Sequence, residues 1–193
     1  GKETEKVVSN IILRTLRVAK YEAENKGHFG IASKYYCHFT SPIRRYPDLF
    51  IHRIISKYLE NDYMVNDFWI KKYEKRAEKR AENCSERERT ATKVEREAED
   101  IKKAEYMENK IGEEYEGIIS SITNFGIFVE LENTIEGLIR YETLGDEYFI
   151  YNEERREAIG EHSNKIYKIG DKVKIRVADA NKALRRIDFE IVE

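Results

Sequence analysis

The chain has 193 residues, of which 37% are charged, and its formal net charge is only −2. This length allows one or two domains with a hydrophobic core. The net charge is too small to indicate whether a binding partner would be acidic or basic. The two cysteines lie far apart without a paired motif, which argues against a disulfide framework and a zinc site and favours a reducing, cytoplasmic setting.

No apolar run approaches the length that a membrane span needs, so the sequence predicts no membrane segment. The chain starts at Gly1 rather than at a methionine, and we therefore expect it to be part of a longer polypeptide. Its charge is divided unevenly. Residues 112–193 carry 18 acidic and 11 basic residues, a net of −7, and the rest carries 19 acidic and 24 basic residues, a net of +5.

The first expected element is a helix over residues 4–24, in which apolar residues recur at helical spacing and Gly27 follows as a stop signal. Residues 28–39 are aromatic and rich in strand-forming residues, which predicts a strand or an extended loop. A second helix should begin near Pro47, because proline suits the first helical position, and it should end at residues 60–62.

The segment from 66 to 110 contains neither proline nor glycine, and 21 of the 33 residues between 71 and 103 are charged. A narrow apolar stripe in steps of three and four predicts one or two long helices with a thin buried face. The stripe consists of Trp69, Tyr73, Ala77, Ala81, Cys84, Ala91, Val94, Ala98 and Ile101. Residues 71–80 hold six bases and two acids. They are either a solvated helical face with Glu–Lys and Glu–Arg pairs or a contact for a phosphate backbone.

After Gly112 the pattern changes to short β segments with turn signals between them. The expected strands cover residues 115–122, 126–131, 136–144, 171–180 and 185–192. Five strands suit a small closed Greek-key barrel of the OB type. The connection 145–170 is long and polar, and we expect it to carry its own turn or short helix around residues 152–160. The predicted fold class is therefore α+β, with a mainly helical part over 1–111 followed by a five-stranded OB-fold β-barrel over 112–193.

The second expected strand suggests a surface for nucleic acid. Alternation puts Phe128 on the opposite face from its neighbours, with Phe125 at the preceding bend, and an outward aromatic pair on an OB barrel can stack on bases. Arg140, together with Lys174 or Arg176, could then contact phosphates. The alternative is that both phenylalanines fill the core. The net charge of −7 speaks against strong non-specific RNA binding by this half.

Residues 38–48, HFTSPIRRYPD, place two arginines between the only two prolines of the chain. The planar fork of an arginine donates two parallel hydrogen bonds to a phosphate, and flanking prolines restrict the backbone that carries it. The start of the following helix also favours an anion. The alternative, open for both Arg44 and Arg45, is an ion pair with Asp48 or another carboxylate.

Two resemblances sharpen these interpretations. The run GEEYEGIISSITNFGIFVEL, with EGLIRYETL and GDKVKIRVADANKALRRIDFEI after it, resembles the RNA-binding OB module first described in a ribosomal protein. In that family two aromatic residues and a histidine form the binding face, and they map to Phe125, Phe128 and Arg140. An arginine at the histidine position keeps a planar surface but fixes a positive charge.

The run GHFGIASKYYCHFTSPIRRYPDLFIHRII closely resembles the end of the catalytic domain of the ribonuclease II/R exoribonucleases, and NCSERERTATKVERE fits the same family. The resemblance implies that 1–111 is the remnant of a catalytic domain and 112–193 its RNA-binding domain. It also implies that Arg44 contacts the phosphate of the scissile bond, with Arg45 and Tyr46 as supporting contacts to the RNA.

The family reaction removes nucleoside 5′-monophosphates from the 3′ end of RNA with Mg²⁺ held by clustered aspartates. Residues 1–60 contain no such cluster, so the metal ligands are expected upstream and this chain alone is expected to be inactive. The implied partner is single-stranded RNA and the implied location is the cytoplasm. A cut catalytic domain would expose apolar surface, so a swapped dimer is a further expectation. The rival interpretations are a non-enzymatic single-stranded RNA-binding module with a helical spacer, and a structural barrel that binds protein.

Overall fold

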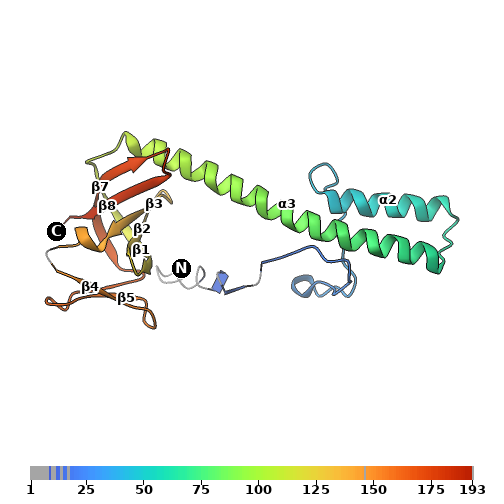
Figure 1. The fold of residues 1–193 in the computed structure, drawn as a ribbon, viewed down its shortest axis with the longest axis horizontal. Coiled ribbons are helices and arrows are strands. Elements are labelled where there is room, and N and C mark those ends of the chain that lie inside the picture. Colours follow the sequence, from blue (N-terminus) through green and yellow to red (C-terminus); the bar gives the residue numbers. More distant parts are fainter. Residues whose placement is uncertain (1–8, 10–11, 14, 17, 146, 193) are drawn as a thin grey trace. The chain divides into compact units, whose positions relative to one another are not determined.

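The computed structural model describes the chain except for residues 1–8, 10–11, 14, 17, 146 and 193 (Figure 1). Two long helices precede a closed β-barrel and a small separate sheet. The chain divides into two compact parts, residues 17–94 and residues 95–193 with 1–16, and each is described below by itself. This arrangement confirms the predicted α+β class with an OB-type barrel after a helical part.

The segment before the first long helix is mostly irregular. Of the helix predicted over 4–24, the residues Ser9, Ile12, Leu13 and Thr15 are helical, and residues 4–8, 10, 11, 14 and 17 lie outside the described residues. Residues 18–24 form no helix, so that end of the prediction was wrong. The reason is that the backbone N–H of Tyr21 donates to the side chain of Ser85 instead of to a helical carbonyl.

Residues 28–39 form the extended loop that the sequence allowed. They contain the short 3-10 helix η1 (Phe29–Ile31), and a single antiparallel bridge joins His28 to Ser33 around it. Helix α2 (Tyr46–Glu60) then begins with proline in its first turn, as predicted, and Asn61 follows its last residue. The four-residue turn 61–64 contains two residues with positive φ, Asp62 and Tyr63, and it is followed by the next helix.

Helix α3 (Asp67–Glu108) is one continuous helix of 42 residues, which confirms the long helix. Its apolar stripe is covered only in the first half. The half-buried residues there are Trp69, Tyr73, Ala77, Ala81 and Cys84, with Ser85 buried beside them. Ala91, Val94, Ala98 and Ile101 are exposed, so the predicted packing of the second half was wrong. A helix so rich in acids and bases stays solvated there because side-chain pairs support it without a packing partner.

The barrel consists of β1 (Glu114–Thr123), β2 (Gly126–Leu131), β3 (Glu136–Arg140), β7 (Lys172–Asn181) and β8 (Arg186–Ile191). They close in the order β1-β2-β3-β8-β7, with β3 and β8 parallel and the other neighbours antiparallel. All five predicted strands are present. The third is shorter than predicted, because the chain turns into the 3-10 helix η2 (Tyr141–Thr143).

The barrel core takes one or more apolar side chains from each strand. Ile119, Val129, Ile139, Ile175 and Phe189 are almost completely buried in a single cluster. The same cluster includes Ala104 and Met107, both 0% exposed, from the last turns of α3. The end of α3 therefore closes this core, and a carboxylate oxygen of Glu108 accepts the backbone N–H of Lys182 at 2.9 Å to fix it to the β7–β8 turn.

The long connection forms a second sheet, and of the turn or short helix expected around 152–160 the structure has the turn. Strands β4 (Phe149–Asn152), β5 (Glu157–Gly160) and β6 (Ile166–Lys168) pair antiparallel. Residues 153–156 form the turn between β4 and β5, and its last residue, Arg156, has a positive φ of 52°. The strands on either side of this turn were not predicted, because charged residues leave little of the alternation that indicates a hairpin. Aromatic contacts stabilise this sheet. The ring of Phe149 stacks with that of Tyr141 in η2, with the ring centres 6.2 Å apart, and its centre lies 5.7 Å from that of the Tyr167 ring.

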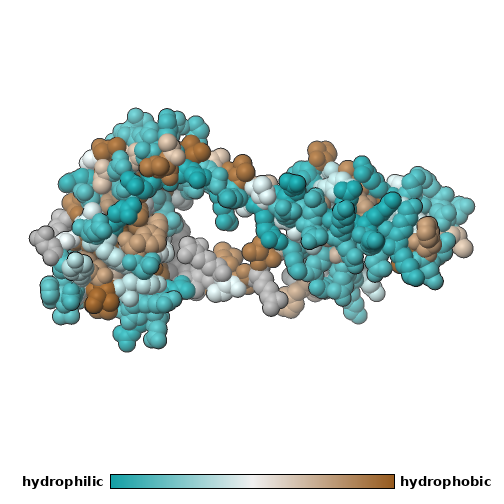
Figure 2. Space-filling view, viewed as in Figure 1, coloured by the Kyte–Doolittle hydropathy of each residue, from teal (hydrophilic) through white to brown (hydrophobic). Residues whose placement is uncertain are grey.

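The exposed surface is mainly hydrophilic over α2 and the first half of α3 (Figure 2). None of the helices in the described part of the chain combines the length and the apolar content that crossing a membrane would require.

Candidate functional site

The loop before α2 is closed by its own backbone. The carbonyl of Ser41 accepts the N–H of Arg44 at 3.3 Å and the N–H of Arg45 at 3.0 Å, so residues 41–45 form a tight turn. The N–H of Ser41 in turn donates to Oδ2 of Asp48, in the first turn of α2, at 2.8 Å. The helix therefore holds both ends of the turn that carries the two arginines.

Arg45 is the structural member of the arginine pair. Its Nη2 lies 2.9 Å from Oδ2 of Asp48, and the two side chains are 23% and 0% exposed. Burial opposes ionisation of Asp48, but the hydrogen bonds from Ser41 and Arg45 outweigh it and hold the pKa of this carboxyl below its usual value. The ion-pair alternative thus applies to Arg45, whose charge serves the loop rather than a ligand.

Arg44 is placed differently. Its side chain is exposed, its neighbour Ile43 is 101% exposed, and among the described residues it has no ion-pair partner. The start of α2 already holds the carboxylate of Asp48, so the favourable field of the helix is partly taken. Of the two arginines, Arg44 is the one whose guanidinium is free to meet an added anion.

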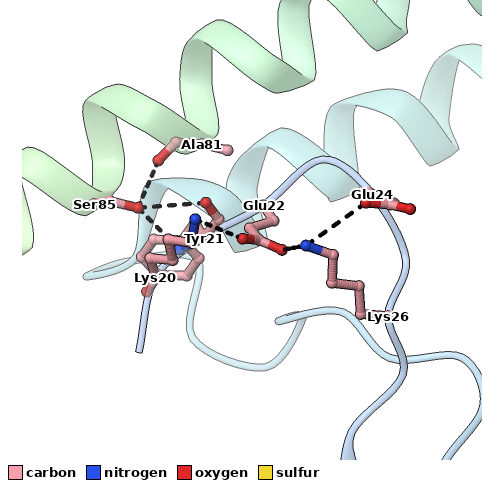
Figure 3. A network of polar contacts seen from close by, with 7 residues as sticks. All are labelled: Lys20, Tyr21, Glu22, Glu24, Lys26, Ala81 and Ser85. Atoms are coloured by element: carbon pink, nitrogen blue, oxygen red, sulfur yellow. Dashed lines mark hydrogen bonds and ion pairs between the residues drawn. The ribbon is translucent and has the colours of Figure 1, made fainter. Parts of the chain in front are cut away.

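A polar network fixes the segment that leads into this loop (Figure 3). The hydroxyl of Ser85 on α3 accepts the N–H of Tyr21 at 2.9 Å, and burial raises the pKa of Tyr21 to about 12. Next along the chain, Glu22 pairs with Lys20 and Lys26, and these hydrogen bonds lower the pKa of Glu22 to about 2. The network anchors residues 20–26 to the same helix that packs against α2.

On the barrel, the two predicted phenylalanines lie together. Their rings meet edge to face at 5.9 Å and 88°, and Phe125 is 51% exposed. Arg140 pairs with Gly126 across β2 and β3. Residues two apart on a strand share a face, so Phe128 and Arg140 both lie on the outer side. Arg140 has no ion pair among the residues that the structure describes. The structure therefore brings these three predicted residues into one patch.

Lys174 and Arg176 do not join that patch. Both pair with Glu114, at 2.7 Å and 2.9 Å, and their hydrogen bonds hold the pKa of Glu114 below its usual value. Glu114 starts β1, whereas the partner of Phe128 on that strand is Ser121, roughly 20 Å further along it. Their predicted phosphate contacts would therefore lie apart from the aromatic pair and compete with Glu114.

A third feature was only partly visible in the sequence. A groove of about 550 Å³ lies between α2 and α3. Its lining residues are Tyr46, Phe50, Arg53, Ile54, Ser56, Lys57, Tyr73, Arg76 and Arg80. The excess of bases in 71–80 left a phosphate contact open as one of two interpretations, and two of the arginines come from there. The contribution of α2 to the same groove had no signal in the sequence.

The described residues contain no group of three or more His, Cys, Asp or Glu side chains that could hold a metal ion. The residues present therefore do not fit a magnesium site of the kind that the resemblance implies, and no step of the chemistry below is assigned to a metal.

Comparison with known proteins gives these features a context. Residues 1–61 match the RNB domain family, and residues 108–192 match the S1 RNA binding domain family. Ribonuclease R 1 of Lactococcus lactis is 50% identical over 190 residues, which are 98% of this chain and 23% of that protein. Ribonuclease R of Escherichia coli is 38% identical over 193 residues, 96% of this chain and 24% of that protein.

Solved structures agree. The apo form of Mycoplasma genitalium RNase R has a TM-score of 0.88 and 34% identity, over 98% of this chain and 30% of that chain. The same values hold for that protein in complex with ribose methylated single-stranded RNA. The chain thus spans about a quarter of the length of the curated relatives named above. Two matched domains, and identity of this level over nearly all of its residues, show that the chain corresponds to the part of the ribonuclease R proteins in which an RNB domain is followed by an S1 RNA binding domain.

Proposed function

We propose that this chain is the part of a processive 3′-to-5′ exoribonuclease that grips single-stranded RNA and supplies one catalytic arginine. The observation that carries the proposal is the patch on the barrel, where an exposed edge-to-face aromatic pair lies beside an arginine without an ion-pair partner. Membership in the ribonuclease R family supports the assignment of RNA as the ligand.

The barrel patch suits bases better than phosphates. The faces of Phe125 and Phe128 can each stack on a base without sequence preference, and Arg140 can stack or contact the adjoining phosphate. The rest of the barrel is acidic, and Lys174 and Arg176 are already paired with Glu114. We therefore expect stacking to supply most of the affinity of this domain, with a modest dependence on salt.

Arg44 would act at the scissile phosphodiester of the longer protein. In the proposed reaction a water oxygen bonds to the phosphorus of the 3′-terminal nucleotide while the bond from phosphorus to the O3′ of the preceding nucleotide breaks. A proton reaches that O3′, and a nucleoside 5′-monophosphate leaves. Arg44 would donate hydrogen bonds to the non-bridging oxygens, where negative charge develops, and so lower the barrier. Its exposed position at the tip of a clamped turn supports this role.

The remaining parts of the reaction are proposals for the longer protein. Mg²⁺ would be held by residues outside the described part of this chain, and the chain alone would be inactive. A cytoplasmic location and a swapped dimer of this chain likewise stay predictions.

The stacking surface predicts a specific loss of binding. Replacing Phe125 with alanine should weaken the affinity of this chain for a fluorescein-labelled single-stranded RNA by about 5- to 150-fold, since a base–aromatic stack contributes about 1–3 kcal/mol. Fluorescence anisotropy at two salt concentrations measures the effect. Tyr148→Ala is the matched control, because this side chain is 82% exposed but lies immediately before β4 of the separate sheet.

Two outcomes would separate the rival functions. If the wild-type chain binds no RNA and Phe125→Ala changes nothing, the acidic barrel is a structural domain that binds protein. If RNA binds as expected but a chain extended upstream through a whole RNB domain releases no monophosphates, the protein is a non-enzymatic RNA-binding module.

A further inference from the structure

The groove between α2 and α3 is lined by bases but by no acid. Four of its lining side chains are cationic, Arg53 and Lys57 from α2 and Arg76 and Arg80 from α3. All four are exposed. Only Lys57 has a carboxylate partner among the described residues, the exposed Glu60. The helical part of the chain thus gathers like charges in one concave place and leaves three of them uncompensated.

The three arginines are held over the tyrosines of the groove. The guanidinium of Arg80 lies 5.3 Å, and that of Arg53 5.9 Å, from the centre of the Tyr46 ring. The guanidinium of Arg76 lies 5.8 Å from the centre of the Tyr73 ring. Contacts of this kind orient a guanidinium while leaving its N–H donors free. The three arginines line a space of about 550 Å³, which is large enough to admit an anion.

We propose that this groove binds the phosphodiester backbone of an RNA strand, as a second contact distinct from the aromatic patch on the barrel. Arginine forks match the paired oxygens of a phosphate, and a row of three uncompensated cations matches a chain of repeating negative charges. At least one guanidinium lies over each tyrosine ring, and the groove therefore offers charge more than stacking. RNA binding in the groove would therefore not depend on the base sequence.

The two surfaces divide the work of binding. The barrel segment 112–193 has a net charge of −7 and offers stacking, whereas the rest of the chain has a net charge of +5. Phosphate neutralisation releases counterions and gives binding its salt dependence. We expect the salt-dependent part of the affinity to arise in the groove. The inference rests on the proposed function in one respect, that RNA is the ligand.

A pair of triple variants tests the groove. Arg53→Gln/Arg76→Gln/Arg80→Gln removes three charges that line it, and Lys71→Gln/Lys75→Gln/Lys79→Gln removes three exposed charges of α3 that do not line it. Binding of fluorescein-labelled oligouridylate to the 193-residue chain is measured by anisotropy over a series of salt concentrations. Circular dichroism and urea unfolding of each variant confirm that it is folded.

The arginine triple should bind about 10- to 100-fold more weakly at low salt, and its plot of log affinity against log salt should be less steep by about 2, since each lost phosphate contact removes about 0.7 from the slope for a single strand. The lysine triple should keep the wild-type slope. A third variant, Arg53→Lys/Arg76→Lys/Arg80→Lys, replaces the same side chains but retains their charges, and it should keep the wild-type salt slope. The comparison shows whether a change of slope in the glutamine variant comes from the lost charge or from disturbed packing.

Equal slopes for the two glutamine triples would overturn the proposal. The proposal would also be overturned if a polyglutamate peptide displaced the labelled RNA as effectively as an unlabelled RNA of equal charge. The groove would then be a site for an acidic protein segment. Failure of the groove proposal and failure of the barrel proposal can be distinguished. If the barrel stacks on bases, Phe125→Ala lowers the affinity for RNA without changing the salt slope, and this holds whether or not the arginine triple changes that slope.

Discussion

Replacing Arg44 with alanine, in the protein extended upstream through a complete RNB domain, should lower the single-turnover rate of RNA cleavage by about 10²- to 10³-fold. The reason is the loss of a fixed positive charge at the phosphate where negative charge develops. The side chain is exposed and has no ion-pair partner among the described residues, so the free energy of unfolding should change little. Rapid-quench kinetics under saturating enzyme measure the rate.

The control for this variant is Lys34→Ala, which removes another exposed cation from the irregular segment before α2. It should cleave like the wild type. Arg44→Lys keeps the charge but not the fork and should fall between the wild type and Arg44→Ala. A rate for Arg44→Ala equal to that of Lys34→Ala would remove this arginine from the catalytic machinery.

Replacing Asp48 with asparagine should lower the stability of the helical part by about 3 kcal/mol, because the removal of one partner of a buried ion pair leaves the other uncompensated. Asparagine keeps the shape of the side chain, so the loss reports the charge. Arg45 can still reach water through its 23% exposed surface, which places the effect at the lower end of the usual range. Urea unfolding of the 193-residue chain, followed by circular dichroism at 222 nm, gives the difference.

The pH dependence of this difference has a fixed sign. The pKa of Asp48 in the folded chain is below its usual value, so its contribution is present above about pH 4, near the pKa of an unfolded aspartate. It is lost as the pH falls through the lower folded value. The gap between the wild type and Asp48→Asn should be constant between about pH 5 and pH 8 and should close only in more acidic solution. A gap that closes as the pH rises would contradict this account of Asp48.

Much of the barrel could be predicted because alternation is a strong signal. Ile127 and Val129 are buried and Phe128 faces outward, as their order along β2 indicates. Alternation alone does not place Arg140, whose position on the face of Phe128 follows from the register between β2 and β3. Nor could it place Lys174 and Arg176, because their pairing with Glu114 depends on which strand lies beside β7 and in which register.

The two arginines of the loop show a different limit. Arg44 and Arg45 both lie within one helical turn of Asp48 in sequence, so spacing allows either to pair with it. The choice is made by the turn, in which the carbonyl of Ser41 accepts both N–H groups and the carboxylate of Asp48 holds the N–H of Ser41. Only the folded loop distinguishes the catalytic candidate from the structural residue.

Features built from distant segments were the hardest to predict. The basic groove joins Arg53 of α2 to Arg76 and Arg80 of α3, and no local pattern links them. Only the turn of the β4–β5 hairpin was predicted, with a short helix as the alternative, because residues 153–156 are charged residues that are also common in helices. The apolar stripe along α3 was predicted with the correct helical spacing, but only its first half is covered. The spacing of apolar residues indicates which face of a helix could be buried, but it does not indicate whether another element covers that face.

We propose that Arg44 serves the scissile phosphate, whereas Arg45 stabilises the loop. The most direct test of this proposal is the single-turnover cleavage rate per folded molecule of Arg44→Gln and Arg45→Gln, measured with saturating RNA in the extended protein. We expect Arg45→Gln to be less stable to urea but to cleave close to the wild-type rate, and Arg44→Gln to be as stable as the wild type but to cleave very slowly. A folded Arg45→Gln that is the slower of the two would contradict the proposal.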